Sequence, residues 1–223
     1  MNWKRLSILA LAVCAAAAVL AWAIRREAPD QHRQARQLIL FYTLSRVSDP
    51  VIVIGDSIVE ASTLPRSICG RPVLNAGLNG ASTASDLDRW LAPALDGKQA
   101  SLIVVSLGVN DALTPSPQSK QSFESRYGAL LTALSKLTPK LVVLAIPPVE
   151  AQGRMTATMR DEVMANVDAY NSILPDLARR NGAAFVALPA MPAPHTIDGV
   201  HLNSEGYLQW DKAAMQAASM VCS

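Results

Sequence analysis

The chain has 223 residues, of which 50% are hydrophobic, and a formal net charge of only +2. This length is sufficient for one domain of ordinary size with a substantial core. The small net charge and the aromatic content of 5% argue against nucleic acid as a partner, since the sequence has no basic run interleaved with aromatic residues.

An uncharged apolar segment, residues 7–24 (SILALAVCAAAAVLAWAI), lies between two pairs of basic residues near the N-terminus. It is long for the core of a signal peptide and just long enough for a membrane span. Residues 21–23, Ala-Trp-Ala, fit a small-x-small cleavage site, whereas the alanine-rich run favours an uncleaved anchor. Residues 1–27 are therefore predicted to be either a signal peptide or a single-span inner-membrane anchor. Both alternatives export the rest of the chain to the periplasm or the cell exterior.

Residues 28–48 are polar at first and are predicted to form a linker and a short helix, followed by one folded domain, residues 49–223. In that domain, short β-branched apolar runs alternate with amphipathic segments. The runs that predict buried strands are residues 51–54, 72–74, 101–107, 141–146 and 183–186. The segments that predict helices are residues 83–95, 118–137, 155–180 and 204–217. This alternation predicts a three-layer α/β/α domain with about five parallel strands.

Two of the three cysteines, Cys69 and Cys222, lie in the part predicted to be exported, and Cys14 lies in the apolar segment. An even pair outside the cytosol predicts a disulfide. The bond would join the C-terminal tail to an early loop and, by the loop-entropy estimate, would contribute about 4–5 kcal/mol. The alternative is two buried free thiols.

Glycine and small polar residues follow three of the predicted strands. The segments are GDS (residues 55–57), NAGLNG (75–80) and GVND (108–111). In an open α/β sheet, ligands bind beyond the carboxyl ends of the strands. The three segments are therefore predicted to meet at one edge of the sheet, where Ser57 is the candidate nucleophile.

A serine hydroxyl is a weak nucleophile and needs a base within hydrogen-bond reach. His32 lies in the linker, and His195 lies in a proline-rich loop. His201 lies in the segment DGVH, where Asp198 can fold back to the far nitrogen of the imidazole. This spacing predicts a catalytic triad of Ser57, Asp198 and His201.

Ester cleavage also requires hydrogen-bond donors for the oxyanion. The backbone N–H of Ser57 is one candidate, because it would lie at the start of a helix. The backbone N–H of Gly77 is a second, because glycine lets the main chain approach a substrate closely. The side-chain amide of Asn110 is a third.

The four segments GDS, NAGLNG, GVND and DGVH occur in this order over most of the chain, and the set resembles the four sequence blocks of the SGNH (GDSL) hydrolase family. The resemblance implies Ser57 as nucleophile, His201 as base, Asp198 as its orienting acid, and Gly77 and Asn110 as oxyanion donors. It also implies a flavodoxin-like sheet with strand order 2-1-3-4-5, and neither a metal nor a cofactor. The first block continues as GDSIVEAS where the family often has GDSLS or GDSIT, which leaves the substrate open.

The remaining polar residues of the blocks are predicted to have structural roles. A carboxylate beside a helix N-terminus can bind backbone N–H groups, so Asp56 is predicted to hold the turn before Ser57. The other residues predicted to be scaffold, loop or solvated positions are Glu60, Asn75, Asn79, Gly80, Asp111 and His195.

The predicted function is that of a metal-independent serine esterase acting on a small acyl ester or an acylated glycan. The compact chain has no obvious inserted lid, which favours short acyl groups such as O-acetyl on carbohydrate. Four alternatives stay open: a lysophospholipase or a thioesterase acting on longer chains, an acyltransferase, and a membrane-tethered module that binds a glycan or acyl group without turnover. The sequence does not determine the oligomeric state.

Overall fold

The structure is a computed structural model in which residues 14, 31–114 and 119–222 are described. By its internal contacts the chain divides into two units, Met1–Ile39 and Leu40–Ser223. Most of the predicted signal or anchor segment lies outside the described residues. Among the helices that are described, none combines the length and apolarity needed to cross a bilayer.

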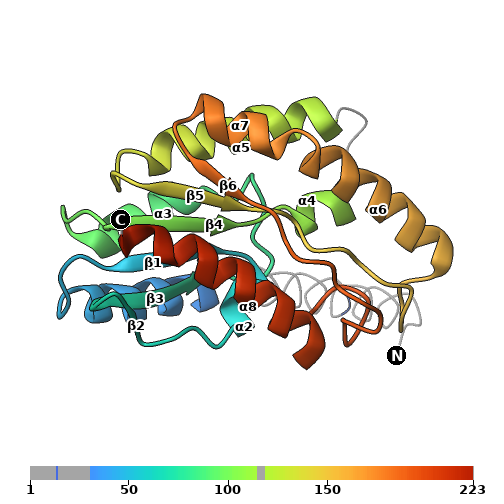
Figure 1. The fold of residues 1–223 in the computed structure, drawn as a ribbon, viewed down its shortest axis with the longest axis horizontal. Coiled ribbons are helices and arrows are strands. Elements are labelled where there is room, and N and C mark those ends of the chain that lie inside the picture. Colours follow the sequence, from blue (N-terminus) through green and yellow to red (C-terminus); the bar gives the residue numbers. More distant parts are fainter. Residues whose placement is uncertain (1–13, 15–30, 115–118, 223) are drawn as a thin grey trace, which may run out of the picture. The chain divides into compact units, whose positions relative to one another are not determined.

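The larger unit is built on a six-stranded sheet (Figure 1). The strands are β1 (Val51–Gly55), β2 (Ser67–Ile68), β3 (Arg71–Gly77), β4 (Leu102–Ser106), β5 (Leu141–Leu144) and β6 (Ala184–Val186). Their order is β2-β3-β1-β4-β5-β6, and every pairing is parallel except that of β2 with β3. The five parallel strands therefore lie in the order β3-β1-β4-β5-β6. Counted along the chain without β2, this is the predicted order 2-1-3-4-5. The two-residue β2 is an additional antiparallel edge strand that the sequence analysis did not predict.

Helices cover both faces of this sheet, as the alternating pattern predicts. They are α2 (Ser57–Ala61), α3 (Leu87–Leu95), α4 (Val109–Leu113), α5 (Ser119–Leu134), α6 (Ala157–Asn171), α7 (Leu174–Arg180) and α8 (Ser204–Ser219), followed by the short 3₁₀ helix η1 (Met220–Cys222). Figure 1 shows α5, α6 and α7 on one side of the sheet and α8 on the other. Trp210 of α8 is fully buried and donates its indole N–H to Ser106 Oγ at 3.2 Å, which fixes α8 against β4.

Two of the predicted helices differ from the structure by more than three residues or in number. The helix predicted to start at Thr83 starts at Leu87, because the backbone N–H and hydroxyl of Thr83 bond the buried carboxylate of Asp111 and keep the intervening residues in turns. The helix predicted over residues 155–180 is divided into α6 and α7. Pro175 lies in the first turn of α7 and has no N–H to continue a helix from the preceding turn.

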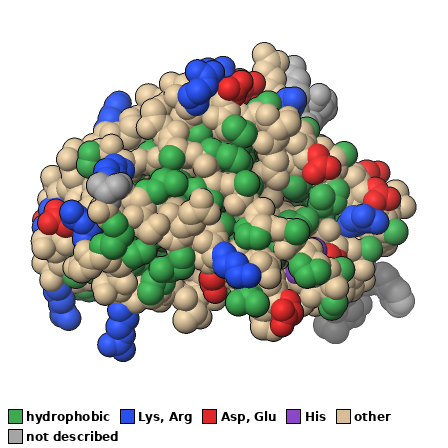
Figure 2. All heavy atoms as spheres, in the orientation of Figure 1, with side chains coloured by type: hydrophobic (Ala, Val, Ile, Leu, Met, Phe, Trp, Pro, Cys, Tyr) green, Lys and Arg blue, Asp and Glu red, His purple; other side chains and the backbone are tan. Residues whose placement is uncertain are grey.

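The core consists of the strands and the helix faces turned toward them. Every residue of β1, β4 and β5 is buried, as expected for strands covered on both faces. Phe123 and Tyr127 lie on the predicted apolar face of α5 and are fully buried, and Phe123 stacks on Tyr170 of α6 with ring centroids 4.0 Å apart. On the surface seen in Figure 2, basic and acidic side chains are interspersed among hydrophobic ones, in keeping with the small net charge.

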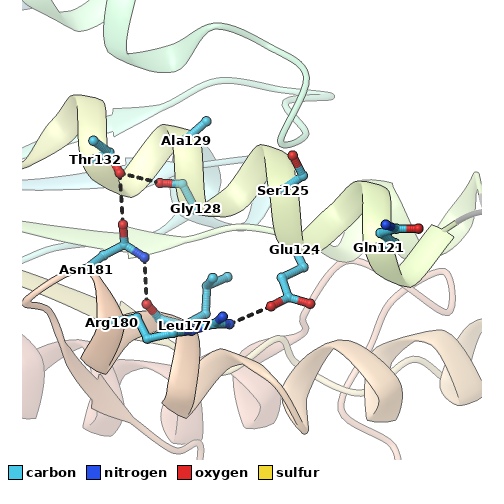
Figure 3. A pocket seen from close by; sticks show the side chains of 9 residues that line it. All are labelled: Gln121, Glu124, Ser125, Gly128, Ala129, Thr132, Leu177, Arg180 and Asn181. Carbon is cyan, nitrogen blue, oxygen red and sulfur yellow. Dashed lines mark hydrogen bonds and ion pairs between the residues drawn. The ribbon is translucent and has the colours of Figure 1, made fainter.

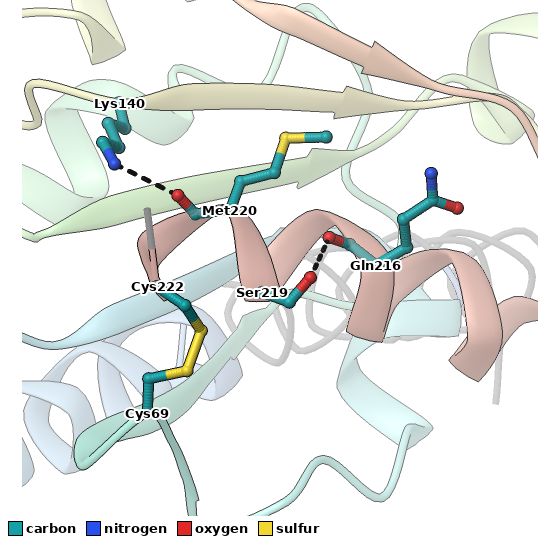
Figure 4. Close-up of a disulfide and its surroundings, with 6 residues drawn as sticks. All are labelled: Cys69, Lys140, Gln216, Ser219, Met220 and Cys222. Carbon is teal, nitrogen blue, oxygen red and sulfur yellow. Dashed lines mark hydrogen bonds between the residues drawn. A yellow bond between two sulfur atoms is a disulfide. The ribbon is translucent and has the colours of Figure 1, made fainter.

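A disulfide joins the C-terminal tail to the loop between β2 and β3 (Figure 4). It links Cys69 to Cys222 with a Cα–Cα distance of 5.7 Å, as the cysteine count predicts. Lys140, just before β5, donates from Nζ to the carbonyl of Met220 at 3.1 Å. The end of the chain is therefore bound to two separate places in the sheet layer.

Candidate active site

The carboxyl ends of three neighbouring strands bring the predicted segments together. Gly55, the last residue of β1, is in register with Gly77 of β3 and with Ser106 of β4. Because these pairings are parallel, the residues that follow the three strands emerge at the same edge of the sheet. Glycine at position 55 permits the close approach, since an added Cβ would lie 1.9 Å from the Ser106 carbonyl oxygen.

Ser57 is the first residue of α2 and is half-buried at this edge. Asp56 precedes it as the N-cap, and its Oδ1 accepts the N–H of Ile58 at 2.9 Å. Burial raises the pKa of Asp56 from its ordinary value of 3.8 to about 7, although the bond from Ile58 acts in the opposite direction. Asp56 thus has the predicted structural role of fixing the turn that presents Ser57.

Ser57, His201 and Asp198 form a continuous hydrogen-bonded chain. His201 Nε2 lies 3.0 Å from Ser57 Oγ, and His201 Nδ1 lies 2.7 Å from Asp198 Oδ2. The side chains of His201 and Asp198 are 42% and 51% exposed, so the pair borders on solvent. Desolvation acts to raise the pKa of Asp198, but the hydrogen bonds from His201 and Val200, together with the electrostatic interaction with His201, outweigh it and lower the pKa, which favours the carboxylate.

The loop before α8 holds Asp198 and His201 in this orientation. Asp198 Oδ1 accepts the backbone N–H groups of Val200 at 3.0 Å and His201 at 2.8 Å. Gly199, between Asp198 and Val200, has a φ of +98°, a conformation that glycine adopts without steric cost. The loop ends at Asn203, which caps α8 by accepting the N–H of Gly206. One carboxylate oxygen therefore fixes the backbone, while the other orients the imidazole.

Two predicted oxyanion donors are available at the serine. Among the described residues, none accepts a bond from the Ser57 N–H, which lies at the open N-terminus of α2. Asn110 of α4 donates one amide hydrogen of Nδ2 to the Ala81 carbonyl at 2.8 Å. That bond orients the side chain and leaves the second amide hydrogen for another acceptor.

The geometry of Gly77 does not fit its predicted role as the second oxyanion donor. The Gly77 N–H donates to Asn75 Oδ1 at 2.9 Å, so it is already engaged. Gly77 is also buried against α2, where an added Cβ would lie 2.1 Å from the backbone nitrogen of Glu60. A glycine is therefore required at position 77 for the packing of β3 on α2.

Gly80, predicted to be scaffold, is an exposed residue in a turn at the same strand ends. The N–H of Ala81 bonds the Leu78 carbonyl at 3.0 Å, and Gly80 has a φ of +74° at the third position of this turn, as a type II turn requires. The turn is held to Gly55 by the N–H of Leu78 and to Asn110 through Ala81. In the described part of the chain, no acceptor is bonded to the Gly80 N–H. In the sequence, the only signal for this turn is the dipeptide Asn79-Gly80, a common turn signal that does not by itself indicate an oxyanion donor.

The other polar residues of the blocks connect the loops. Asp111 is buried and accepts from the backbone N–H and hydroxyl of Thr83, with Arg126 Nη2 3.5 Å away. Glu60, predicted to be solvated, instead accepts the backbone N–H of Asn79 through Oε2. Glu60 therefore supports the turn that contains Gly80.

Asn75 and His195 also have defined partners. Asn75 Nδ2 donates to the Val59 carbonyl of α2 at 2.6 Å, which fits its predicted scaffold role. His195 is buried, and its Nδ1 lies 3.2 Å from Glu150 Oε1. It is not the histidine bonded to Ser57, although it belongs to the same loop as His201.

Outside the triad, the described residues include a groove between two helices but no metal-binding cluster. No group of three or more His, Cys, Asp or Glu side chains in them could hold a metal ion. A groove of about 500 Å³ lies between α5 and α7 (Figure 3). Four of its polar side chains are paired, Glu124 with Arg180 and Thr132 with Asn181. This groove lacks the nucleophile and base that the carboxyl edge of the sheet has.

Comparisons with known proteins identify the family to which this chain belongs. The profile of the GDSL-like lipase/acylhydrolase family matches residues 53–208. A Streptococcus pneumonia structure provisionally described as a platelet activating factor is 20% identical, with a TM-score of 0.68 over 90% of this chain and 99% of that one. The acetyl xylan esterase AlAXEase is 19% identical, with a TM-score of 0.60 over 75% of this chain and 98% of that one.

A third similar structure is a catalytic mutant of Axe2, an acetylxylan esterase from Geobacillus stearothermophilus, at 17% identity and a TM-score of 0.58 over 77% of this chain and 94% of that one. At these identities the structures show the shared fold alone. Comparison with curated protein sequences gives no significant match. The family match covers most of the chain, including the segments that hold Ser57, Asn110, Asp198 and His201. The chain therefore belongs to the GDSL-like lipase/acylhydrolase family and is a carboxylic ester hydrolase.

Proposed function

We propose that the enzyme hydrolyses short acyl esters through Ser57, His201 and Asp198. The observation that carries the proposal is the unbroken contact from Asp198 to His201 at 2.7 Å and from His201 to Ser57 at 3.0 Å. His201 Nε2 takes the proton of Ser57 as Oγ attacks the acyl carbonyl. The proton then passes to the leaving alcohol, and the acyl group remains on Ser57. A water molecule repeats the sequence, activated by His201, and releases the carboxylic acid.

The oxyanion is proposed to lie among the Ser57 N–H, the Gly80 N–H and the Asn110 amide. Gly80 replaces Gly77 in this role because the Gly77 N–H is bonded to Asn75, whereas Gly80 is an exposed residue whose N–H has no bonded acceptor in the described part of the chain. Each such donor contributes typically about 2.7–4 kcal/mol to stabilising the transition state. Asp198 remains ionised and stabilises the imidazolium that forms on His201.

The proposed substrates are esters of short acids, with O-acetyl groups on carbohydrate as the favoured class. The half-exposed side chains of Asp198 and His201 support a shallow, open site that can accept a bulky alcohol. Two of the similar structures described above are named as acetyl xylan esterases, which supports the same class. A series of p-nitrophenyl esters of increasing chain length tests this proposal. A maximum at acetyl or propionyl is expected, and a maximum at long chains would instead favour a lysophospholipase or thioesterase.

We further propose that the enzyme works outside the cytoplasm. The uncharged N-terminal segment and the Cys69–Cys222 disulfide support this location, because disulfides persist in oxidising compartments. Fractionation of cells tests the location, and mass measurement of the recovered protein with and without reductant tests the disulfide. Recovery in the cytosol with reduced thiols would contradict the proposal.

The decisive test of hydrolysis is the variant Ser57→Ala. It is expected to retain the fold and to lose turnover of p-nitrophenyl acetate, because no alkoxide can form. Retained turnover would remove the assignment of Ser57 and favour another nucleophile. Product analysis with sugar acceptors in the same assay distinguishes hydrolysis from acyl transfer, because both pass through the same acyl-enzyme.

A further inference from the structure

A glutamate outside the triad holds the loop that contains Asp198 and His201. Glu150 lies between β5 and α6, and its side chain is only 14% exposed. Its Oε2 accepts three hydrogen bonds, from the His195 N–H at 2.9 Å, the Thr196 N–H at 2.7 Å and the Thr196 hydroxyl at 2.6 Å. One carboxylate oxygen thus binds the loop just before Asp198.

The backbone of Glu150 binds the same loop at a second point. Its N–H donates to the carbonyl of Gly199 at 2.8 Å. The approach is close, because a Cβ added to Gly199 would lie 2.6 Å from the Glu150 carbonyl oxygen. The two points of attachment, at residues 195–196 and at residue 199, lie on either side of Asp198.

The neighbouring residues of the β5–α6 segment reinforce this attachment. His195 Nε2 lies 3.3 Å from the Pro148 carbonyl, and Gln152 Nε2 donates to the Ile197 carbonyl at 3.2 Å. The rest of the loop is bonded mainly to itself, as in the bond from the Ile197 N–H to the His201 carbonyl at 2.8 Å. The β5–α6 segment is therefore what connects the Asp198–His201 loop to the neighbouring strand end.

The attachment matters because Asp198 and His201 are half exposed and have little packing of their own. A misplacement of about 1 Å in a catalytic group can cost about 10²-fold in rate. Burial acts to raise the pKa of Glu150, but the bonds from Thr196 and His195 outweigh it and lower the pKa. The group therefore stays an ionised acceptor for all three donors.

We propose that Glu150 is a positioning residue for the triad, which sets the distance from His201 to Ser57 by fixing the loop on both sides of Asp198. This inference rests on the proposed function. The proposed role depends on where the accepting oxygen of Glu150 lies, and not on the negative charge of its carboxylate. In a Glu150→Gln variant the amide oxygen can take the place of Oε2, and the amide nitrogen then faces His195 Nδ1.

The test compares Glu150→Gln, Glu150→Asp and Glu150→Ala with wild type and with Glu162→Ala, a control at an exposed glutamate of α6. The measurements are kcat and KM for p-nitrophenyl acetate and the rate at which a fluorophosphonate probe labels Ser57. Each is made on folded protein, verified by circular dichroism, well below the melting temperature of that variant. A residue with a purely structural role would lower the melting temperature without changing kcat under these conditions.

The shorter side chain in Glu150→Asp keeps the negative charge but cannot reach all three donors. Its kcat and labelling rate are therefore expected to fall about tenfold or more, while its KM stays within about threefold of wild type. Glu150→Ala is expected to fall at least as far, and Glu150→Gln and Glu162→Ala are expected to stay within about threefold of wild type. If Glu150→Ala does not fold, the pair Glu150→Asp and Glu150→Gln still decides the question.

Wild-type kcat in Glu150→Asp would overturn the inference, as would an equal loss in Glu150→Gln or a change confined to KM. Wild-type protein that is not labelled at Ser57 would overturn the proposed function and this inference together. If wild type is labelled and all Glu150 variants are labelled at the same rate, the inference alone fails.

Discussion

Replacement of Asn110 by alanine tests the oxyanion site most selectively. Asn110 Nδ2 donates one hydrogen to the Ala81 carbonyl at 2.8 Å, and the second is the proposed oxyanion donor. Loss of one such donor costs about 2.7–4 kcal/mol of barrier stabilisation, so kcat should fall by about 10²–10³-fold. Loss of the bond to Ala81 should lower the free energy of unfolding by only about 0.5–1.5 kcal/mol. A melting temperature a few degrees lower should therefore accompany a large loss of rate.

Asn166 of α6 provides a matched control. It donates from Nδ2 to the Ala112 carbonyl at 3.2 Å, so it too is an asparagine bonded to a backbone carbonyl, and Ala112 belongs to the helix that contains Asn110. Asn166→Ala should lower the melting temperature by a similar amount and leave kcat for p-nitrophenyl acetate within about threefold of wild type. Equal kcat losses in the two variants, or wild-type kcat in Asn110→Ala, would refute the oxyanion reasoning.

Three further predictions concern stability. Gly77→Ala should prevent folding or sharply lower the melting temperature, because the new Cβ would lie 2.1 Å from a backbone nitrogen of α2. Gly80→Ala should fold at a cost of about 1–2 kcal/mol, since only its φ of +74° is unfavourable. Equal melting temperatures in the two variants would contradict this distinction. Reduction of the Cys69–Cys222 bond should destabilise the protein by about 5 kcal/mol, measured by denaturant unfolding with and without reductant; an unchanged midpoint would show that the bond does not constrain the unfolded chain. Asp56 has a pKa of about 7 in the folded protein against an ordinary value of 3.8, so the folded state binds more protons than the unfolded state between these pH values. The free energy of unfolding should therefore fall as the pH rises from about 4 to about 7, and this dependence should be absent in Asp56→Asn. The same pH dependence in both proteins would contradict the assignment to Asp56.

The five parallel strands could be predicted from the sequence because each of them contains a short apolar run between turn residues. The order of the parallel strands came with the family resemblance carried by the four segments, and the structure has that order. The edge strand β2 has only two residues, Ser67–Ile68, too few to leave a periodic pattern in the sequence.

The helix boundaries were less predictable because tertiary contacts set one of them. Thr83 is kept out of α3 by Asp111, a residue far along the chain, and local sequence contains no sign of that contact. The division between α6 and α7 is different, because Pro175 was visible in the sequence as a residue that interrupts a helix.

The candidate triad was recognisable because each member lies in a short distinctive segment at a strand end or before a helix. The glycine proposed as oxyanion donor was not recognisable, since two glycines lie in NAGLNG and residue type alone does not tell which N–H is engaged. The structure separates them through the bond from Gly77 to Asn75 and the turn that exposes Gly80. Glu150 had no sequence signal, because its three bonds are to a loop 45 or 46 residues away.

The central claim is that His201 activates Ser57 across the carboxyl edge of the sheet. The most direct measurement is the rate of fluorophosphonate labelling, with the modified residue mapped by peptide mass spectrometry, in wild type and in His201→Ala. Wild type should be modified at Ser57, and His201→Ala should react at least about 10²-fold more slowly. Labelling of Ser57 at the wild-type rate in His201→Ala, or modification of a different residue in wild type, would contradict the account.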